Sequence, residues 1–196
     1  MSKRIFIIIV CLQVLLLTGM ILDNQYILRY GQPILLKTEP IDPNSLFSGE
    51  YVDLNYEISD LDLDQTVYEV PPAGMALEAY YAQGKTVYVT LKKNGRFYEA
   101  ARIARHRTEP GAGQIVLKGR IRWSEPIVAV RVSYGIESYY TPEGKAKGYE
   151  RPTNGTPVVT VRVDRFGRGR IEKVVIDPTI KPVIPEWMRR EKVEPK

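Results

Sequence analysis

A chain of 196 residues is long enough for one domain with its own hydrophobic core and barely long enough for two. The formal net charge is +5, and a balance this mild does not favour a nucleic-acid-binding protein. The single cysteine, Cys11, excludes a disulfide bond within the chain.

The first predicted element is a membrane-spanning helix near the N-terminus. Residues 5–22 form an apolar run of 18 residues, interrupted only by Gln13, Thr18 and Gly19. A helix of that length spans about 27 Å, close to the thickness of the hydrocarbon layer of a bilayer. The sequence after Leu22 contains no small-x-small cleavage site, so we expect an uncleaved anchor rather than a signal peptide.

The charges around this helix set its expected orientation. Lys3 and Arg4 precede the apolar run, whereas Arg29 and Lys37 follow it, so the positive-inside count nearly ties. A tail of four residues most simply stays in the cytoplasm, which places the rest of the chain outside. The expected regions are an anchor with a short cytoplasmic end (1–31), a soluble β domain (32–178) and a tail rich in proline and charge (179–196).

The clearest strand signal lies within residues 40–58. This segment begins with prolines, turns at Gly49 and then alternates. An alternation with period two after a turn is typical of a half-buried β-strand. The face expected to point inward carries Val52, Leu54, Tyr56 and Ile58.

The rest of the chain has the pattern of short strands separated by turn residues. Asn94-Gly95 between two alternating runs is a strong hairpin signal, and residues 76–82 favour a short helical turn. Strands at this spacing predict an all-β fold with minor helix, either an antiparallel β sandwich or a partly closed barrel. Further strands are predicted over residues 33–38, 60–64, 86–92, 96–105, 114–123, 127–134, 158–164 and 170–177.

The predicted strand over residues 114–123 carries a row of basic side chains. Alternation points Trp123 inward and Lys118, Arg120 and Arg122 outward. Such a row either meets lipid phosphates just above a bilayer or is an ordinary solvated face. The sequence leaves both interpretations open.

No metal, cofactor or catalytic site is predicted. His106 is the only histidine, and no second histidine or nearby cysteine can join it in a zinc site. The acids of residues 60–64 match the start of a calcium loop, but the expected glycine and glutamate are replaced by Gln65 and Pro71. We therefore expect these acids to form a solvated strand edge.

Two blocks of sequence resemble a known family. Residues 49–56 read Gly-Glu-Tyr-Val-Asp-Leu-Asn-Tyr, which resembles the motif that names the GDYXXLXY family, with Glu50 in place of the family's Asp. Residues 134–144, which end in Tyr-Thr-Pro-Glu-Gly, are similar to that family's second block. The resemblance implies a bacterial cell-envelope protein of no established activity, anchored in the inner (cytoplasmic) membrane with its domain outside the cytoplasm. It also implies a polytopic membrane protein as partner.

The acids and tyrosines of the two blocks are candidates for a binding groove. Gathered at one end of a sheet, they could bind a partner; otherwise the acids cap backbone amides and the aromatic groups fill the core. The candidate residues are Asp42, Glu50, Tyr51, Tyr56, Tyr140, Glu143 and Glu150.

The sequence favours a non-catalytic binding module, with an envelope hydrolase as the alternative. Ser45 or Ser48 with Lys85 or Lys118 could form a Ser-Lys pair, but no spacing demands it. The motif region faintly resembles the nucleophile segment of signal peptidases, yet the serine position falls on Ile41, which offers no nucleophile. Contact with a partner's transmembrane helix is expected through the small and polar residues of the anchor.

Overall fold

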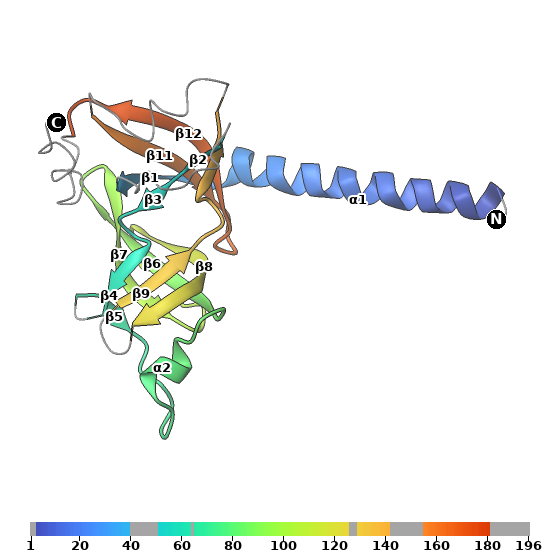
Figure 1. Cartoon of the computed structure of the whole chain (residues 1–196). Helices are drawn as coiled ribbons and strands as arrows, with labels where there is room; N and C mark the ends of the chain where they lie inside the picture. Colours follow the sequence, from blue (N-terminus) through green and yellow to red (C-terminus); the bar gives the residue numbers. More distant parts are fainter. Residues whose placement is uncertain (1–2, 40–50, 64, 126–128, 142–154, 181–196) are drawn as a thin grey trace, which may run out of the picture.

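The computed structural model describes residues 3–39, 51–63, 65–125, 129–141 and 155–180. One long helix projects from a β body (Figure 1). The described strands form two larger sheets and a two-stranded ribbon, and the sheet structure curls into a half-barrel. The predicted all-β class with minor helix is therefore confirmed.

The helix α1 (Lys3–Tyr30) contains the predicted span and continues beyond it. Its large apolar side chains from Ile5 to Leu22 are 41–71% exposed, so the described part of the β body does not cover them. In the described part of the chain, α1 alone is long and apolar enough to cross a membrane. The helix fits a membrane-anchored protein.

The strands occur in the predicted order, with β5 and β10 as additions. Hydrogen bonds join them in the orders β12-β11-β1-β3, β10-β2 and β4-β9-β8-β6-β7-β5. The predicted helical turn is α2 (Leu77–Tyr80). The described strands are β1 (Gln32–Glu39), β2 (Tyr51–Asp53), β3 (Asn55–Tyr56), β4 (Asp60–Asp62), β5 (Val67–Tyr68), β6 (Thr86–Asn94), β7 (Phe97–Ala104), β8 (Gln114–Glu125), β9 (Ala129–Ser133), β10 (Ser138–Tyr140), β11 (Thr156–Val163) and β12 (Gly169–Asp177).

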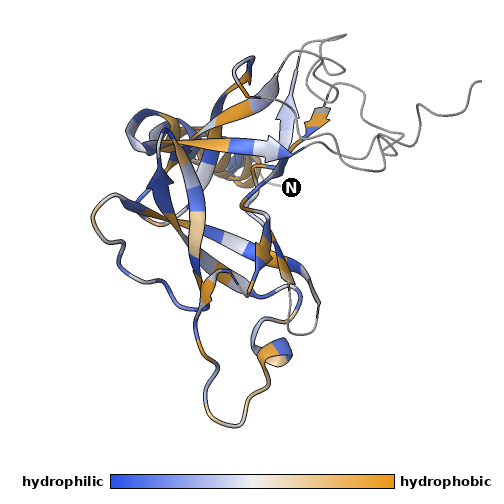
Figure 2. Ribbon diagram, turned by 90° about the vertical axis from the view of Figure 1, so that its left-hand side faces the viewer, coloured by the Kyte–Doolittle hydropathy of each residue, from blue (hydrophilic) through white to orange (hydrophobic). Residues whose placement is uncertain are grey.

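The buried apolar side chains of these sheets form a hydrophobic core. Hydrophobic and hydrophilic residues alternate along the strands (Figure 2), as expected where one face of a sheet is buried. Val52, Leu54, Tyr56 and Ile58 are between 0% and 4% exposed, which confirms their predicted inward face.

The predicted continuous strand around Leu54 is divided between two sheets. β2 pairs with β10, whereas β3 pairs with β1. Leu54 lies between them and donates its N–H to the backbone oxygen of Glu137 at 2.6 Å. The two short strands therefore keep the predicted alternation while the backbone changes partner.

The acidic segment lies at the edge of the six-stranded sheet. Leu61 and Leu63 are buried, and Asp60 of β4 forms an ion pair with Arg131 of β9. The predicted hairpin is also present, because β6 and β7 join at Gly95, whose φ is +59°. Glycine adopts this left-handed conformation without steric cost.

The orientation of Trp123 differs from the prediction. The pairing of β8 with β9 shifts between Ile121, which faces Val132, and Trp123, which faces Arg131. The extra residue on β8 forms a β-bulge, which reverses the alternation of side chains. The predicted inward position of Trp123 is therefore wrong, and its side chain is 38% exposed.

Candidate functional site

β2 from the first motif block and β10 from the second pair as a two-stranded ribbon. Tyr51 pairs with Tyr140, and Val52 pairs with Tyr139, across an antiparallel ladder. Segments that are almost ninety residues apart in sequence are thereby joined at one place. Local sequence alone does not form this ribbon, because both strands are too short to be stable without a partner strand.

Two buried tyrosines connect the blocks in opposite directions. Tyr56 is fully buried and its hydroxyl donates to the backbone oxygen of Ile136 at 2.6 Å. Tyr134 is 6% exposed and its hydroxyl donates to the backbone oxygen of Ile58, also at 2.6 Å. Burial raises the pKa of both hydroxyls far above the ordinary tyrosine value, so both remain protonated donors.

Glu137 fixes the turn that leads from β9 into β10. Its carboxylate accepts the N–H of Gly135 at 2.9 Å and also the N–H of Tyr134. The backbone oxygen of the same residue accepts the N–H of Leu54. Glu137 therefore ties the second block to the first through both its side chain and its backbone.

The structure brings two described members of the candidate groove together in the ribbon and places the third in the core. Tyr140 is 56% exposed and lies opposite Tyr51 in the ribbon, whereas the side chain of Tyr56 lies in the core. The remaining candidates lie outside the described residues: Asp42, Glu50, Glu143 and Glu150.

The two serines of the hydrolase alternative, Ser45 and Ser48, also lie outside the described residues. Ser59 is 3% exposed, and its hydroxyl has no hydrogen-bond partner among the described residues.

A hollow of about 510 Å³, which we call the Trp123 hollow, opens beside residues of both motif blocks. Asn55 of the first block and Glu137 of the second line it together with side chains from β8 and β9. The sequence analysis missed this site, because the β-bulge that brings Trp123 to the surface depends on strand pairing. Its lining residues are Asn55, Ser59, Gln83, Arg122, Trp123, Arg131, Val132, Ser133 and Glu137.

The side chains of the Trp123 hollow offer cations and an aromatic face. The guanidinium of Arg131 lies 5.9 Å from the centre of the Trp123 ring and is held there by two 2.5 Å bonds to Asp60. Arg122 is exposed and forms no ion pair with a described residue. These groups suit a protein segment that carries carboxylate or carbonyl acceptors beside apolar groups.

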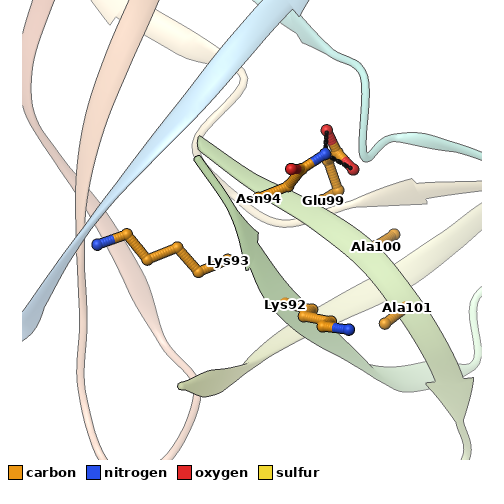
Figure 3. A pocket seen from close by; sticks show the side chains of 6 residues that line it. All are labelled: Lys92, Lys93, Asn94, Glu99, Ala100 and Ala101. Atoms are coloured by element: carbon orange, nitrogen blue, oxygen red, sulfur yellow. Dashed lines mark hydrogen bonds between the residues drawn. The ribbon is translucent and has the colours of Figure 1, made fainter. Parts of the chain in front are cut away.

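A second hollow, of about 380 Å³, lies on the β6–β7 hairpin. Figure 3 shows Lys92 and Lys93 extending in different directions from β6, while Asn94 donates to both carboxylate oxygens of Glu99 at 2.9 and 3.0 Å. This hollow contains no residue of either motif block. Its polar groups are occupied by each other or diverge, so it is the weaker candidate for a binding site.

Comparison with known proteins supports the resemblance seen in the two blocks. The family model described as GDYXXLXY protein matches residues 13–174, which extend from α1 into β12 and include both motif blocks. No curated protein and no solved structure matches the chain. Because the match covers most of the chain, this protein belongs to the GDYXXLXY family.

Proposed function

We propose that this protein is a single-pass binding module of the bacterial cell envelope, anchored in the inner membrane by residues 1–31. Its β domain, residues 32–178, lies outside the cytoplasm and is followed by a tail over residues 179–196. The observation that carries this proposal is the apolar surface of α1, which is exposed from Ile5 to Leu22 while Ile27 is fully buried against the β body. An apolar surface of this length needs lipid or other transmembrane helices around it.

The proposed partner is a polytopic membrane protein, and the first point of contact is α1 itself. Gln13, Thr18 and Gly19 interrupt the apolar surface and are exposed. Apart from its chain neighbours and the local helix backbone, no atom lies within 4 Å of the place where a Cβ on Gly19 would be. Small and polar residues allow transmembrane helices to approach closely and to bond across their interface.

The second proposed point of contact is the Trp123 hollow on the β domain. An exposed tryptophan between two arginines is the type of residue cluster that supplies most of the energy of a protein interface. The hollow also lies next to both motif blocks, through Asn55 and Glu137. We place the recognition of an extramembrane loop of the partner here.

Photo-crosslinking in cells tests both contacts. A crosslinker in place of Gln13 reports on the helix, and one in place of Gln83 reports on the rim of the Trp123 hollow. We expect both positions to trap the same polytopic membrane protein. Trp123→Ala should then lower the yield from position 83 but leave the yield from position 13 nearly unchanged, because the helix contact remains.

Lys92→Gln is the matched control, since Lys92 lines the other hollow and should leave both yields unchanged. An unaltered yield from position 83 in Trp123→Ala would remove the hollow from the proposal. Adducts with copies of this chain alone, from both positions, would contradict the binding function. A reporter enzyme that is active only outside the cytoplasm, fused after the last residue, tests the orientation separately.

A further inference from the structure

The turn between β11 and β12, residues 164–168, lies against α1 where the apolar surface ends. Arg168 donates from Nη1 and Nη2 to the two carboxylate oxygens of Asp23 at 2.8 and 2.9 Å. Asp23 directly follows Leu22, so it lies about 1.5 Å further along the helix axis. Figure 1 shows this turn on the side of the body from which α1 emerges. The turn is therefore level with the end of the predicted membrane span.

The conformation of this turn is fixed by Asp164. Its carboxylate accepts the N–H groups of Phe166 and Arg168, both at 2.8 Å, and the Nε of Arg168 at 2.7 Å. Gly167 has a φ of +82° and its backbone oxygen accepts the N–H of Lys118 on β8 at 2.8 Å. The turn is held from within and is attached to the sheet behind it.

This rigid turn presents an aromatic ring to the outside. Phe166 is 51% exposed, although the chain has a large apolar core in which such a side chain is normally placed. The guanidinium of Arg165 lies 4.7 Å from the centre of its ring, and that of Arg168 lies 5.8 Å away. An exposed ring between cations matches the chemistry of the boundary between hydrocarbon and headgroups.

The cations around the turn are not all neutralised. Arg168 is paired with both Asp23 and Asp164. Arg165, Lys118 and Arg107 form no ion pair with a described residue, and Arg107 donates instead to the backbone oxygen of Arg165. Lys118 lies next to the turn, because its Cβ is 3.4 Å from the place where a Cβ on Gly167 would be. Three positive charges, none in an ion pair with a described residue, therefore lie beside or on the turn that also carries the exposed Phe166.

We propose that residues 164–168 are a second membrane contact, in which Phe166 enters the headgroup layer and Arg165, Arg107 and Lys118 bind the phosphates of acidic phospholipids. The proposal rests on the proposed anchoring of α1 in a bilayer. Lipid is the occupant because the bond between Asp23 and Arg168 holds the turn at the height where the bilayer surface begins. Cations close to an anionic leaflet are attracted to it, and the attraction falls off within a Debye length.

Nitroxide labels on the full-length chain test this contact. Cys11→Ser removes the only native cysteine, and single cysteines are then introduced as Phe166→Cys and, with the ring retained, Arg165→Cys. Leu15→Cys marks the span. Lys93→Cys marks the other end of the body. Lys93 lies in the same hairpin as Arg96, and Arg96 forms an ion pair with Asp177, which is at the end of β12 away from α1. The protein is reconstituted into phosphatidylcholine vesicles with and without phosphatidylglycerol.

The measurement is the rate of collision of each label with oxygen, which concentrates in lipid, relative to a nickel chelate, which stays in water. We expect the labels at positions 165 and 166 to have ratios several-fold above the label at position 93 and below the label at position 15. Phosphatidylglycerol should raise the ratio at position 166, and Lys118→Gln with Arg107→Gln should cancel that increase.

Three outcomes overturn all or part of the proposal, and they differ in what else they remove. If position 15 is in lipid but positions 165 and 166 are as accessible to nickel as position 93, the turn does not touch the membrane and the anchoring proposal stands. If position 15 is itself accessible to nickel, the anchor is absent and both proposals fail. If the contact occurs without any effect of phosphatidylglycerol, the assignment of acidic phospholipid is wrong.

Discussion

The hydroxyl of Tyr56 and the backbone oxygen of Ile136 are 2.6 Å apart, although the two residues are separated by 80 positions. Tyr56 is the last residue of the first motif block, and Ile136 belongs to the second. The bond is buried, so it connects the two blocks where water cannot replace it. This gives the motif tyrosine a structural role that a phenylalanine cannot fill.

The first prediction follows from that bond. Tyr56→Phe removes the donor and leaves a buried carbonyl without it, which should lower the free energy of unfolding by about 1–3 kcal/mol. Urea unfolding of the detergent-solubilised protein measures the change. Tyr68→Phe is the control, because Tyr68 is 38% exposed and should change stability by less than about 0.5 kcal/mol. Equal effects of the two changes would contradict this role.

The second prediction concerns the space that Tyr134 requires. A Cβ on Gly119 of β8 would lie 2.3 Å from Cγ1 of Val132 and 3.0 Å from Cδ1 of Tyr134. Gly119→Ala should therefore shift β9 and destabilise the fold by about 1–3 kcal/mol through overpacking. The loss should appear as a lower midpoint of thermal unfolding. Gly111→Ala should cost less, since its nearest neighbour is the flexible end of Gln114, and the opposite ranking would refute the argument.

The third prediction concerns stability in acid. Burial alone would raise the pKa of Glu69, but bonds from His106, from the N–H groups of Arg105 and His106 and from Tyr80 outweigh it and lower the pKa to about 2. An unfolded glutamate has a pKa of about 4.3, so the unfolded chain binds more protons in acid. The contribution of Glu69 should be complete above about pH 5 and should disappear as the pH falls towards 2.

Glu69→Gln tests this contribution. The free energy of unfolding of the variant should fall less steeply between pH 5 and pH 3 than that of the natural protein. Some dependence should remain, because donors from the backbone and side chain of Arg168 also lower the pKa of Asp164 despite its burial. The exposed Glu78 provides the control in Glu78→Gln. Parallel curves for the natural protein and Glu69→Gln would show that Glu69 contributes nothing.

Much of this fold follows from local pattern, and the parts that do not are non-local. Alternation correctly predicts that Val52, Leu54 and Ile58 face the core, because the period of a strand does not depend on its neighbour. It cannot show that the strand divides at Leu54, since that depends on the distant oxygen of Glu137. The strands β5 and β10 are likewise too short for any periodic signal.

The candidate site is less accessible to sequence reasoning for the same reason. The Trp123 hollow takes residues from β3, β8, β9 and three connections, so no single segment contains its pattern. The adjacent Arg122-Trp123 pair is the one local signal, and alternation assigns the tryptophan to the wrong face because it cannot include a bulge. Similarly, the apolar run predicts the helix over residues 5–22 but not that α1 continues to Tyr30.

The fourth prediction concerns how α1 is joined to the β body. The side chains of Arg168 and Asp23 are 36% and 45% exposed, so their ion pair should contribute no more than about 1 kcal/mol to stability. Asp23→Ala, which breaks this ion pair but keeps the bond between Arg168 and Asp164, should therefore leave global unfolding almost unchanged but loosen the last turns of α1. Hydrogen exchange should report amides after Asn24 exchanging up to about fivefold faster. Arg96→Gln, which breaks the ion pair with Asp177 at the opposite end of β12, should not affect them. Unchanged exchange in Asp23→Ala would mean that this ion pair does not hold the helix, and that the buried Ile27 and the bond from Arg170 to Asn24 fix it instead.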